Sequence, residues 1–223
     1  MSSQESPREL RRLYETRFAG RREYRERVWR VLVRDYFDRW LPRRGSVLDL
    51  GCGHCEFINN VLAPIRLGMD LNPDAVARAA PGVRILAQSC ADRWAIDDES
   101  LDVVFTSNFF EHLPSKRDVR AALIESRRCL RSGGRLIALG PNIRYLNGAY
   151  WDFYDHHVPL TERSLGEVMV ETGFTVEQQL GRFLPYTMST GRVQAPIWTL
   201  RLYLKLNILW PIFGRQFLIV ARK

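Results

Sequence analysis

The sequence predicts an α/β protein with a doubly wound, mostly parallel sheet and an N-terminal helical cap. From residue 46 onward, short apolar runs typical of buried strands alternate with segments of helical periodicity. The first apolar run ends in a glycine-rich turn, and ligands of parallel sheets bind beyond the carboxyl ends of the strands. The 223 residues contain no internal repeat and no low-complexity linker, which favours one domain behind the cap.

Residues 8–40 carry the periodicity of helices. Apolar side chains recur at three- and four-residue steps from Leu10 to Phe18 and again from Tyr24 to Trp40, with Gly20 as the predicted break. We therefore divide the chain into a helical cap, residues 1–44, and a main domain, residues 45–223.

The main domain is expected to form seven strands. They are residues 46–50, 65–69, 83–87, 101–106, 135–139, 174–180 and 216–221. Ser115 opens a predicted helix that runs through Leu130 and stops at the glycines 133–134, and Thr161 opens one that runs to Thr172. The sequence Asn72-Pro73 indicates a further helix start.

Composition excludes several classes of protein. The chain is 46% hydrophobic and 26% charged, which is typical of a soluble globular domain. No apolar segment follows the first residues, so no export signal is expected, and charged residues interrupt the apolar stretch at 197–213, so no spanning helix is expected. Four cysteines are too few for a secreted disulfide framework. These features predict a cytoplasmic protein with reduced thiols.

The net charge of +8 is unevenly distributed. Residues 1–44 carry +6, residues 45–177 carry −5, and residues 178–223 carry +7 without a single acid. An acid-free tail favours an anionic partner, which would be a phosphate-bearing substrate, an anionic membrane surface or nucleic acid. Arginine that simply solvates apolar surface is an equally good interpretation.

The first strand leads into Asp49-Leu-Gly51-Cys-Gly53. The glycines allow the backbone to approach a ligand closely and to turn into a helix whose N-terminus would offer free N–H groups. Asp70, at the end of the second strand, stands where it can accept hydrogen bonds from a ribose. A dinucleotide site needs glycine at position 56, so Glu56 disfavours NAD.

Further segments follow in order: Asp70-Leu71, residues 90–92, residues 107–113 and residues 130–134. With the glycine loop they resemble the class I S-adenosylmethionine (SAM)-dependent methyltransferases, and residues 142–161 are similar to a bacterial small-molecule subgroup. The resemblance implies a seven-stranded, Rossmann-like methyltransferase fold. It also implies methyl transfer from SAM to an O, N or C nucleophile of a small-molecule or lipid- or glycan-linked acceptor.

The resemblance implies a set of cofactor-binding residues. They are Arg17, Asp49, Gly51, Cys52, Gly53, Asp70, Leu71, Asp92 and Asn108. The glycines would line the methionine part of SAM, Asp70 would hold the ribose hydroxyls, Asp92 would accept from the adenine amino group, and Arg17 would reach the carboxylate.

Cys55 replaces a glycine of the usual pattern. We expect a cost to fit and not a loss of binding, because early helix positions tolerate a side chain. The same residue completes Cys52-Gly-His-Cys55, the C-G-H-C sequence of disulfide isomerases, so a thiol-disulfide oxidoreductase is an alternative function. A non-catalytic SAM-binding module is another. No metal site is expected, because Cys90 and Cys129 supply no second ligand pair.

Three histidines follow the fourth and fifth strands. His112, His156 and His157 are candidate general bases for a hydroxyl acceptor, although for each one alone a structural hydrogen-bonding role is the favoured interpretation. The acceptor is expected to contact side chains of the aromatic segment that follows the fifth strand, unless these pack in the core. These candidates are Asn142, Tyr145, Trp151 and Tyr154.

Residues 181–214 form an expected insertion or lid between the last two strands. Residues 199–208 alternate as a strand would, but Arg201 and Lys205 also lie one helical turn apart, so periodicity leaves both structures open. A basic amphipathic element at 196–213 would suit a membrane surface or a lipid-linked substrate, whereas packing over the sheet is slightly favoured. Nucleic acid is not an expected partner, because residues 107–110 lack the motifs of base methylation.

Overall fold

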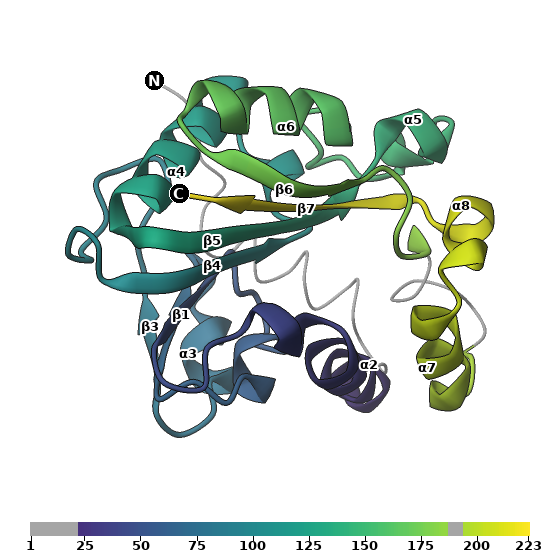
Figure 1. Cartoon of the computed structure of the whole chain (residues 1–223), viewed down its shortest axis with the longest axis horizontal. Helices are drawn as coiled ribbons and strands as arrows, with labels where there is room; N and C mark the ends of the chain where they lie inside the picture. The colour runs from purple at the N-terminus through teal and green to yellow at the C-terminus, as the bar shows by residue number, and fades with distance from the viewer. Residues whose placement is uncertain (1–21, 187–193) are drawn as a thin grey trace.

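A seven-stranded sheet organises the computed structural model, which describes residues 22–186 and 194–223. The strand order is β3-β2-β1-β4-β5-β7-β6 (Figure 1). The strands are β1 (Ser46–Leu50), β2 (Ile65–Met69), β3 (Val83–Leu86), β4 (Leu101–Ser107), β5 (Leu130–Pro141), β6 (Thr175–Leu180) and β7 (Gln216–Arg222). The predicted doubly wound, mostly parallel sheet and its seven strands are confirmed, whereas the first helix predicted for the N-terminal cap, between Leu10 and Phe18, lies outside the described residues.

Strand direction brings particular chain segments to one edge of the sheet. β1 pairs in parallel with β2 and β4, and β4 pairs in parallel with β5. β7 runs antiparallel between β5 and β6. The start of β7 therefore lies at the same edge as the carboxyl ends of β1, β4 and β5.

Helices cover both faces of the sheet (Figure 1). One face packs against α4 (Lys116–Cys129) and α6 (Glu162–Glu171), through buried residues such as Leu123 and Met169. The other packs against α2 (Arg22–Asp35), the 3₁₀ helix η1 (Phe37–Trp40), α3 (Asp74–Arg78) and α7 (Ile197–Lys205). Every residue of β1 is buried, as a central strand between two helical layers requires.

Two predicted helix starts are confirmed by their caps. The Ser115 hydroxyl accepts hydrogen bonds from the backbone N–H groups of Arg117 and Asp118 at the start of α4. Thr161 and Ser164 form a reciprocal capping box at the start of α6. Such caps satisfy N–H groups that have no partner within the helix.

The predicted end of α4 was wrong. The helix stops at Cys129, and β5 begins at the next residue and includes both glycines. A Cβ on Gly134 would lie 2.9 Å from the carbonyl oxygen of Arg131 and 3.1 Å from that of Asp102. Glycine is therefore needed for close packing of the backbone within a strand pair and not for a helix cap.

The helix expected directly after β1 was also wrong. Residues 51–57 form turns, and only the short 3₁₀ helix η2 (Ile58–Asn60) follows them. The glycine loop therefore has no α-helix N-terminus behind it, and its ligand-binding capacity rests on its own backbone and neighbouring side chains. The helix start predicted at Asn72 is confirmed as the short α3.

Residues 197–213 of the insertion are helical and do not form a strand. α7 is followed by η6 (Asn207–Leu209) and α8 (Trp210–Phe213). Leu200 and Leu204 are buried against the sheet side of α7, and α7 packs beside α2, where the Tyr24 hydroxyl donates to the Ala195 carbonyl at 3.0 Å. Within the described ranges, no helix is long and apolar enough to cross a membrane.

Candidate active site

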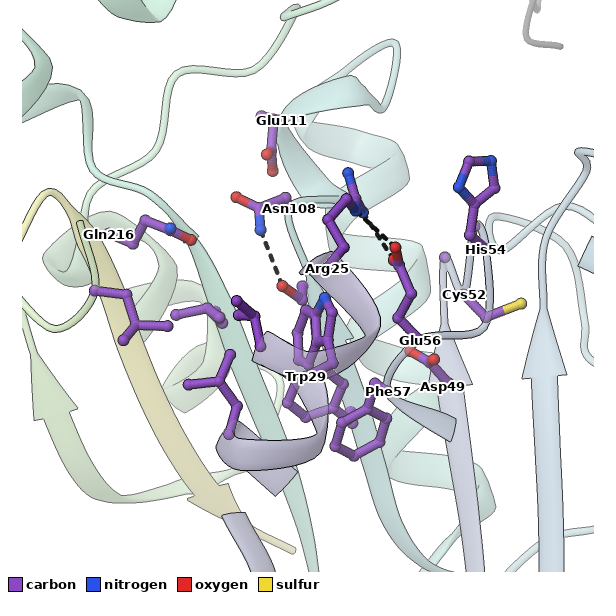
Figure 2. A pocket seen from close by; sticks show the side chains of 18 of the residues that line it. Arg25, Trp29, Asp49, Cys52, His54, Glu56, Phe57, Asn108, Glu111 and Gln216 are labelled. Carbon is purple, nitrogen blue, oxygen red and sulfur yellow. Dashed lines mark hydrogen bonds and ion pairs between the residues drawn. The ribbon is translucent and has the colours of Figure 1, made fainter. Parts of the chain in front are cut away.

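A cavity lies at the carboxyl edge of β1, β4 and β5, between the sheet and α2 (Figure 2). We call the part formed by residues 49–54 its glycine end, and the part formed by Glu111, His112 and His156 its histidine end. The lining comprises Arg25, Val28, Trp29, Leu32, Asp49, Gly51, Cys52, Gly53, His54, Glu56, Phe57, Phe105, Ser107, Asn108, Glu111, His112, Leu139, Phe153, His156, Leu184, Tyr186 and Gln216.

The glycine end has a backbone conformation that residues other than glycine rarely adopt. Gly51 has φ +73° and Gly53 has φ +48°, both in the left-handed region. A Cβ on Gly51 would lie 2.2 Å from a ring carbon of Phe109. The Gly53 N–H donates to Asp70 at 2.7 Å, so that the end of β2 fixes the loop. The loop is thus shaped by both conformation and close packing.

Two buried carboxylates support this loop. Burial and then the charge of Asp70 raise the pKa of Asp49 well above its usual value. Burial likewise raises the pKa of Asp70, although hydrogen bonds from Asn72 and Gly53 oppose the shift. The fold therefore disfavours the ionised form of both carboxyl groups. Carboxyl groups with shifted pKa values are concentrated at functional sites.

The expectation for Cys55 needs correction. Cys55 is not an early helix position: it is fully buried and has φ +61°, in the left-handed region that favours glycine. Its thiol donates to the Ala75 carbonyl at 3.4 Å and lies 3.9 Å from the Cys52 sulfur. The cost of this cysteine is therefore backbone strain in the loop.

The same environment argues against the oxidoreductase alternative. The Cys55 thiol, burial and the Asp49 carboxylate together raise the pKa of Cys52. A reactive cysteine requires the opposite shift, together with exposure to solvent. Both thiols are buried. The pair has the properties of packed core thiols.

An ion pair and three aromatic rings form the wall opposite the histidine end. Arg25 extends from α2 and donates two hydrogen bonds to Glu56, at 2.6 and 2.7 Å (Figure 2). Phe57 and Phe105 stack with ring centroids 3.6 Å apart, and Trp29 meets each of them edge-on. α2 therefore closes the cavity with both a buried charge pair and an aromatic surface.

The histidine end is polar and largely buried. His112 Nδ1 lies 3.1 Å from both a carboxylate oxygen and the backbone carbonyl oxygen of Asp155, and because both oxygens are acceptors, Nδ1 is the donor. Burial acts to lower the pKa of His112, but the hydrogen bond to Asp155 and the charge of Glu111 outweigh it and raise the value. Burial raises the pKa of Glu111 to about 7. The His112 and His156 rings lie 4.9 Å apart.

The structure brings together seven of the predicted site residues. Those in the cavity lining are Asp49, Gly51, Cys52, Gly53, Asn108, His112 and His156. Asn108 has φ +49° and its side-chain amide donates to the Ser107 hydroxyl at 3.0 Å. Their roles toward a ligand stay predictions.

Three other predicted cofactor residues, Asp70, Leu71 and Asp92, are not among the residues that line the cavity. Asp70 uses both carboxylate oxygens on the backbone N–H groups of Gly53 and Asn72, while Leu71 and Asp92 are exposed at the ends of neighbouring strands. Arg17 lies outside the described residues.

The four predicted acceptor residues and His157 are not in the lining. Asn142 is fully buried, caps α5 (Ile143–Leu146) and donates to Glu162 and to the Gly181 carbonyl, which gives it a structural role. The Arg182 guanidinium covers the ring of Tyr145, 4.1 Å from its centroid. The remaining three side chains are exposed, namely Trp151, Tyr154 and His157.

Several lining residues were missed by sequence reasoning. Arg25, Trp29 and Gln216 come from distant elements, and periodicity alone places the first two on a core-facing helix without indicating a cavity. Glu111 carried a signal, because it is a charged residue between Phe109-Phe110 and His112-Leu113. A carboxylate within an apolar run predicts a buried charge, which is rare without a function.

This arrangement defines a class of protein: an α/β domain that holds a small organic ligand at the carboxyl edge of its sheet, between a glycine loop and a polar, buried cluster. Residues 21–179 match the family model described as a methyltransferase domain. The chain belongs to this methyltransferase family.

Individual proteins agree with this assignment. A protein of Encephalitozoon cuniculi named as a methyltransferase is 31% identical over 118 residues, covering 51% of this chain and 52% of its own. The chain thus spans about half the length of the curated relative it matches.

Solved structures show the same fold. A SAM-dependent methyltransferase from Archaeoglobus fulgidus aligns with a TM-score of 0.69 at 20% identity, over 96% of this chain and 99% of that one. A Bacillus halodurans protein titled a methyltransferase aligns with a TM-score of 0.63 at 17% identity, over 86% of this chain and 98% of that one.

Proposed function

We propose that this protein is a SAM-dependent methyltransferase whose acceptor is a hydroxyl-bearing, lipid-linked molecule at an anionic membrane surface. The observation that carries methyl transfer is the single cavity that joins the glycine loop to the buried Glu111 and His112. The acceptor class is supported by a separate surface on α7 and α8, described below.

The residues at the glycine end fit the cofactor. Gly51 and Gly53 offer backbone without side chains, and the Asp49 carboxylate is buried behind them. The aromatic surface of Trp29, Phe57 and Phe105 lies on the opposite wall, and aromatic faces attract a sulfonium as they attract other cations. SAM supplies an activated methyl group, so the protein needs no covalent chemistry of its own.

The protein's contribution is position and exclusion of water. Reaction needs the acceptor oxygen held in line with the methyl carbon at about 3 to 3.5 Å. Asn108 and His112 follow β4, and the ring of His156 lies 4.9 Å from that of His112, so that all three line the cavity where they can hydrogen-bond an acceptor hydroxyl. α2 covers the cavity and reduces its contact with solvent, which strengthens every polar interaction inside.

Exposed apolar side chains gather on the insertion. We call them the apolar crest: Trp198, Leu202, Leu206, Ile208, Ile212 and Phe213. α7 carries two apolar stripes, because Leu200 and Leu204 are buried on the side opposite Trp198 and Leu202. The fold buries one stripe only. Ile208 is 74% exposed and Trp198 is 65% exposed, and several exposed apolar side chains within one short segment favour an interaction surface more than scattered ones do.

The charges around the crest favour an anionic partner. Arg201 and Lys205 are exposed on α7 among the crest residues, and residues 178–223 contain no acid. Asp35 on α2 forms the ion pair with Arg201, at 3.2 Å. Apolar side chains inserted among basic ones match a bilayer interface with anionic headgroups, so we take a membrane surface and not a protein as the occupant.

The crest is structurally linked to the cavity. The Tyr203 hydroxyl of α7 donates to the Phe183 carbonyl at 2.5 Å, and the Arg215 N–H after α8 donates to the Leu184 carbonyl at 2.8 Å. Leu184 and Tyr186 line the cavity. A lipid-linked acceptor at the crest would therefore lie beside the wall of the reaction site.

Vesicle flotation tests the crest. We expect the protein to float with vesicles of phosphatidylcholine mixed with anionic phosphatidylglycerol, and much less with pure phosphatidylcholine. Ile208→Glu should abolish flotation, because it places a charge at the most exposed crest position. Ile124→Glu is the matched control, since Ile124 is 50% exposed on α4 across the sheet.

Two results would contradict the membrane proposal. One is no flotation with anionic vesicles. The other is a dimer in sedimentation equilibrium that Ile208→Glu dissociates, which would make the crest an interface between two copies of the chain. Neither result affects the assignment of the cavity, because SAM binding is measured without vesicles.

A further inference from the structure

Three side chains with metal-ligating atoms meet at the histidine end of the cavity. Glu111, His112 and His156 each offer one ligand atom, and these atoms all lie within 4.8 Å of one another. They come from the segment after β4 and from the loop before α6. The Glu111 carbonyl accepts hydrogen bonds from the N–H groups of His157 and Val158, so the two segments are joined beside the cluster.

His112 is oriented as metal-binding histidines are. Its Nδ1 lies 3.1 Å from the Asp155 carboxylate and 3.1 Å from the Asp155 carbonyl oxygen. These acceptors hold the proton on Nδ1, which leaves the Nε2 lone pair directed into the cavity. Nε2 is 3.9 Å from a Glu111 oxygen. A carboxylate that fixes the tautomer of a ligand histidine is the usual second layer of a metal centre.

Glu111 is a buried carboxylate that needs a counter-charge. Its side chain is 3% exposed, and the described cation within 4 Å is His112, at 3.9 Å. A buried charge is stabilised by pairing or by metal coordination. A divalent cation beside Glu111 would supply the missing positive charge.

His156 is held in place by aromatic packing. Its ring stacks on Phe153 at 5.0 Å and contacts Tyr150 at 4.6 Å. Tyr150 is fully buried and donates to the Val158 carbonyl at 2.5 Å. The ring of His156 is thereby kept edge-on to that of His112, at 4.9 Å. Both imidazoles face the cavity from rigid surroundings.

We propose that Glu111, His112 and His156 bind one first-row divalent cation that holds the acceptor. Two imidazoles and one carboxylate suit Zn²⁺, Fe²⁺, Co²⁺ or Mn²⁺, whereas Mg²⁺ and Ca²⁺ prefer oxygen ligands alone. Three protein ligands leave coordination positions open toward the cavity. A bidentate acceptor, such as a vicinal diol or a hydroxy acid, would fill two of them.

This inference rests on the proposed methyl transfer and specifies its acceptor. Coordination lowers the pKa of a bound hydroxyl, whose proton passes to solvent. The oxygen lone pair then forms the bond to the methyl carbon, while the carbon–sulfur bond breaks and its electron pair stays on sulfur. The products are the methyl ether and S-adenosylhomocysteine, so atoms and charge balance.

The test is Co²⁺ binding to untagged, chelator-treated protein without cofactor or acceptor. We expect one Co²⁺ per chain, with visible absorption bands of a protein-bound ion. Glu111→Gln should weaken binding at least tenfold, and Asp155→Asn should weaken it roughly 10- to 100-fold by releasing His112. His157→Asn is the matched control: it is the exposed neighbour of His156 and should bind Co²⁺ as the wild type does.

Each variant is also titrated with S-adenosylhomocysteine. Retained binding of that ligand shows that Glu111→Gln and Asp155→Asn are folded and that the glycine end is intact. The metal inference is overturned if wild-type protein binds no Co²⁺, or if His157→Asn loses as much affinity as Glu111→Gln. Absence of S-adenosylhomocysteine binding in the wild type would instead refute the proposed function.

Discussion

Gly51→Ala separates the conformational from the packing requirement of the glycine loop. Gly51 has φ +73°, and an alanine there would place its Cβ 2.2 Å from the ring of Phe109. Gly133 has φ +78° and no atom within 4 Å of the corresponding Cβ. The left-handed backbone costs an L-residue roughly 1–2 kcal/mol at either position. Only position 51 adds overpacking, typically about 1–3 kcal/mol.

We therefore expect Gly51→Ala to lower the free energy of unfolding by about 3 kcal/mol and Gly133→Ala by about 1.5 kcal/mol. Urea denaturation at constant m-value measures both. Gly51→Ala should cost less in a Phe109→Ala background than in the wild type, because that background lacks the two ring atoms nearest to the new methyl group. S-adenosylhomocysteine binding should be lost in Gly51→Ala and kept in Gly133→Ala. Equal destabilisation of the two single variants, with unchanged binding in both, would refute this reasoning.

Three further predictions concern buried charges and thiols. Asp49→Asn should raise the free energy of unfolding at pH 7, because burial raises the pKa of the Asp49 carboxyl group in the folded state. The wild type therefore loses stability as the pH rises from the ordinary aspartate pKa of 3.8 through the raised pKa of the folded state. The advantage of the variant over the wild type should vanish below pH 3.8. Urea denaturation across pH tests this, and no gain at neutral pH would contradict it. Glu56→Ala should destabilise by about 3 kcal/mol, since it removes the carboxylate that accepts two hydrogen bonds from the largely buried Arg25 guanidinium, whereas Glu26→Ala, in an exposed pair, should cost under about 1 kcal/mol. Similar losses in the two variants, measured by the same denaturation, would be evidence against a buried pair. The four cysteines should react slowly with iodoacetamide at pH 8 and fully in guanidinium, because they are buried and burial raises the pKa of Cys90 to about 12. Rapid alkylation of two thiols in the folded protein would favour the oxidoreductase alternative.

Local sequence patterns predicted the fold well where only one type of secondary structure was compatible with all of them. β1 and β2 have the predicted bounds, because short apolar runs between turns fit only a buried strand. Residues 199–208 were ambiguous, because Leu200 and Leu204 lie on one face in a helix and in a strand alike. Tertiary packing resolved this: α7 buries these two leucines against the sheet and leaves Leu202 outside.

The glycines at 133–134 misled for a related reason. Glycine after a helical segment is typical of a cap, but here it permits close approach of two strands, a contact between residues far apart in sequence. The prediction for Cys55 was wrong for a similar reason. The helix expected to contain Cys55 does not form, and the residue lies in a turn with a left-handed backbone conformation.

The site was predictable where its residues follow strands in the sequence. Gly51, Asn108 and His112 end parallel strands, and topology alone brings them to one edge. Arg25 and Gln216 reach the same cavity from α2 and from an antiparallel strand, and no local pattern encodes that convergence. Tyr154, a predicted acceptor residue, is exposed and lies outside the cavity lining, and the sequence does not reveal which way such a loop side chain points.

Thermal unfolding with three ligands tests the central claim most directly: that the cavity holds the sulfur-linked adenosine cofactor of methyl transfer. SAM, S-adenosylhomocysteine and NAD would be compared, each at saturating concentration. A specific ligand at 100 times its dissociation constant stabilises the fold by about 2.7 kcal/mol, which raises the melting temperature measurably. We predict a rise with SAM and S-adenosylhomocysteine and none with NAD. A rise with NAD alone, or with none of the three, would contradict the assignment of the cavity.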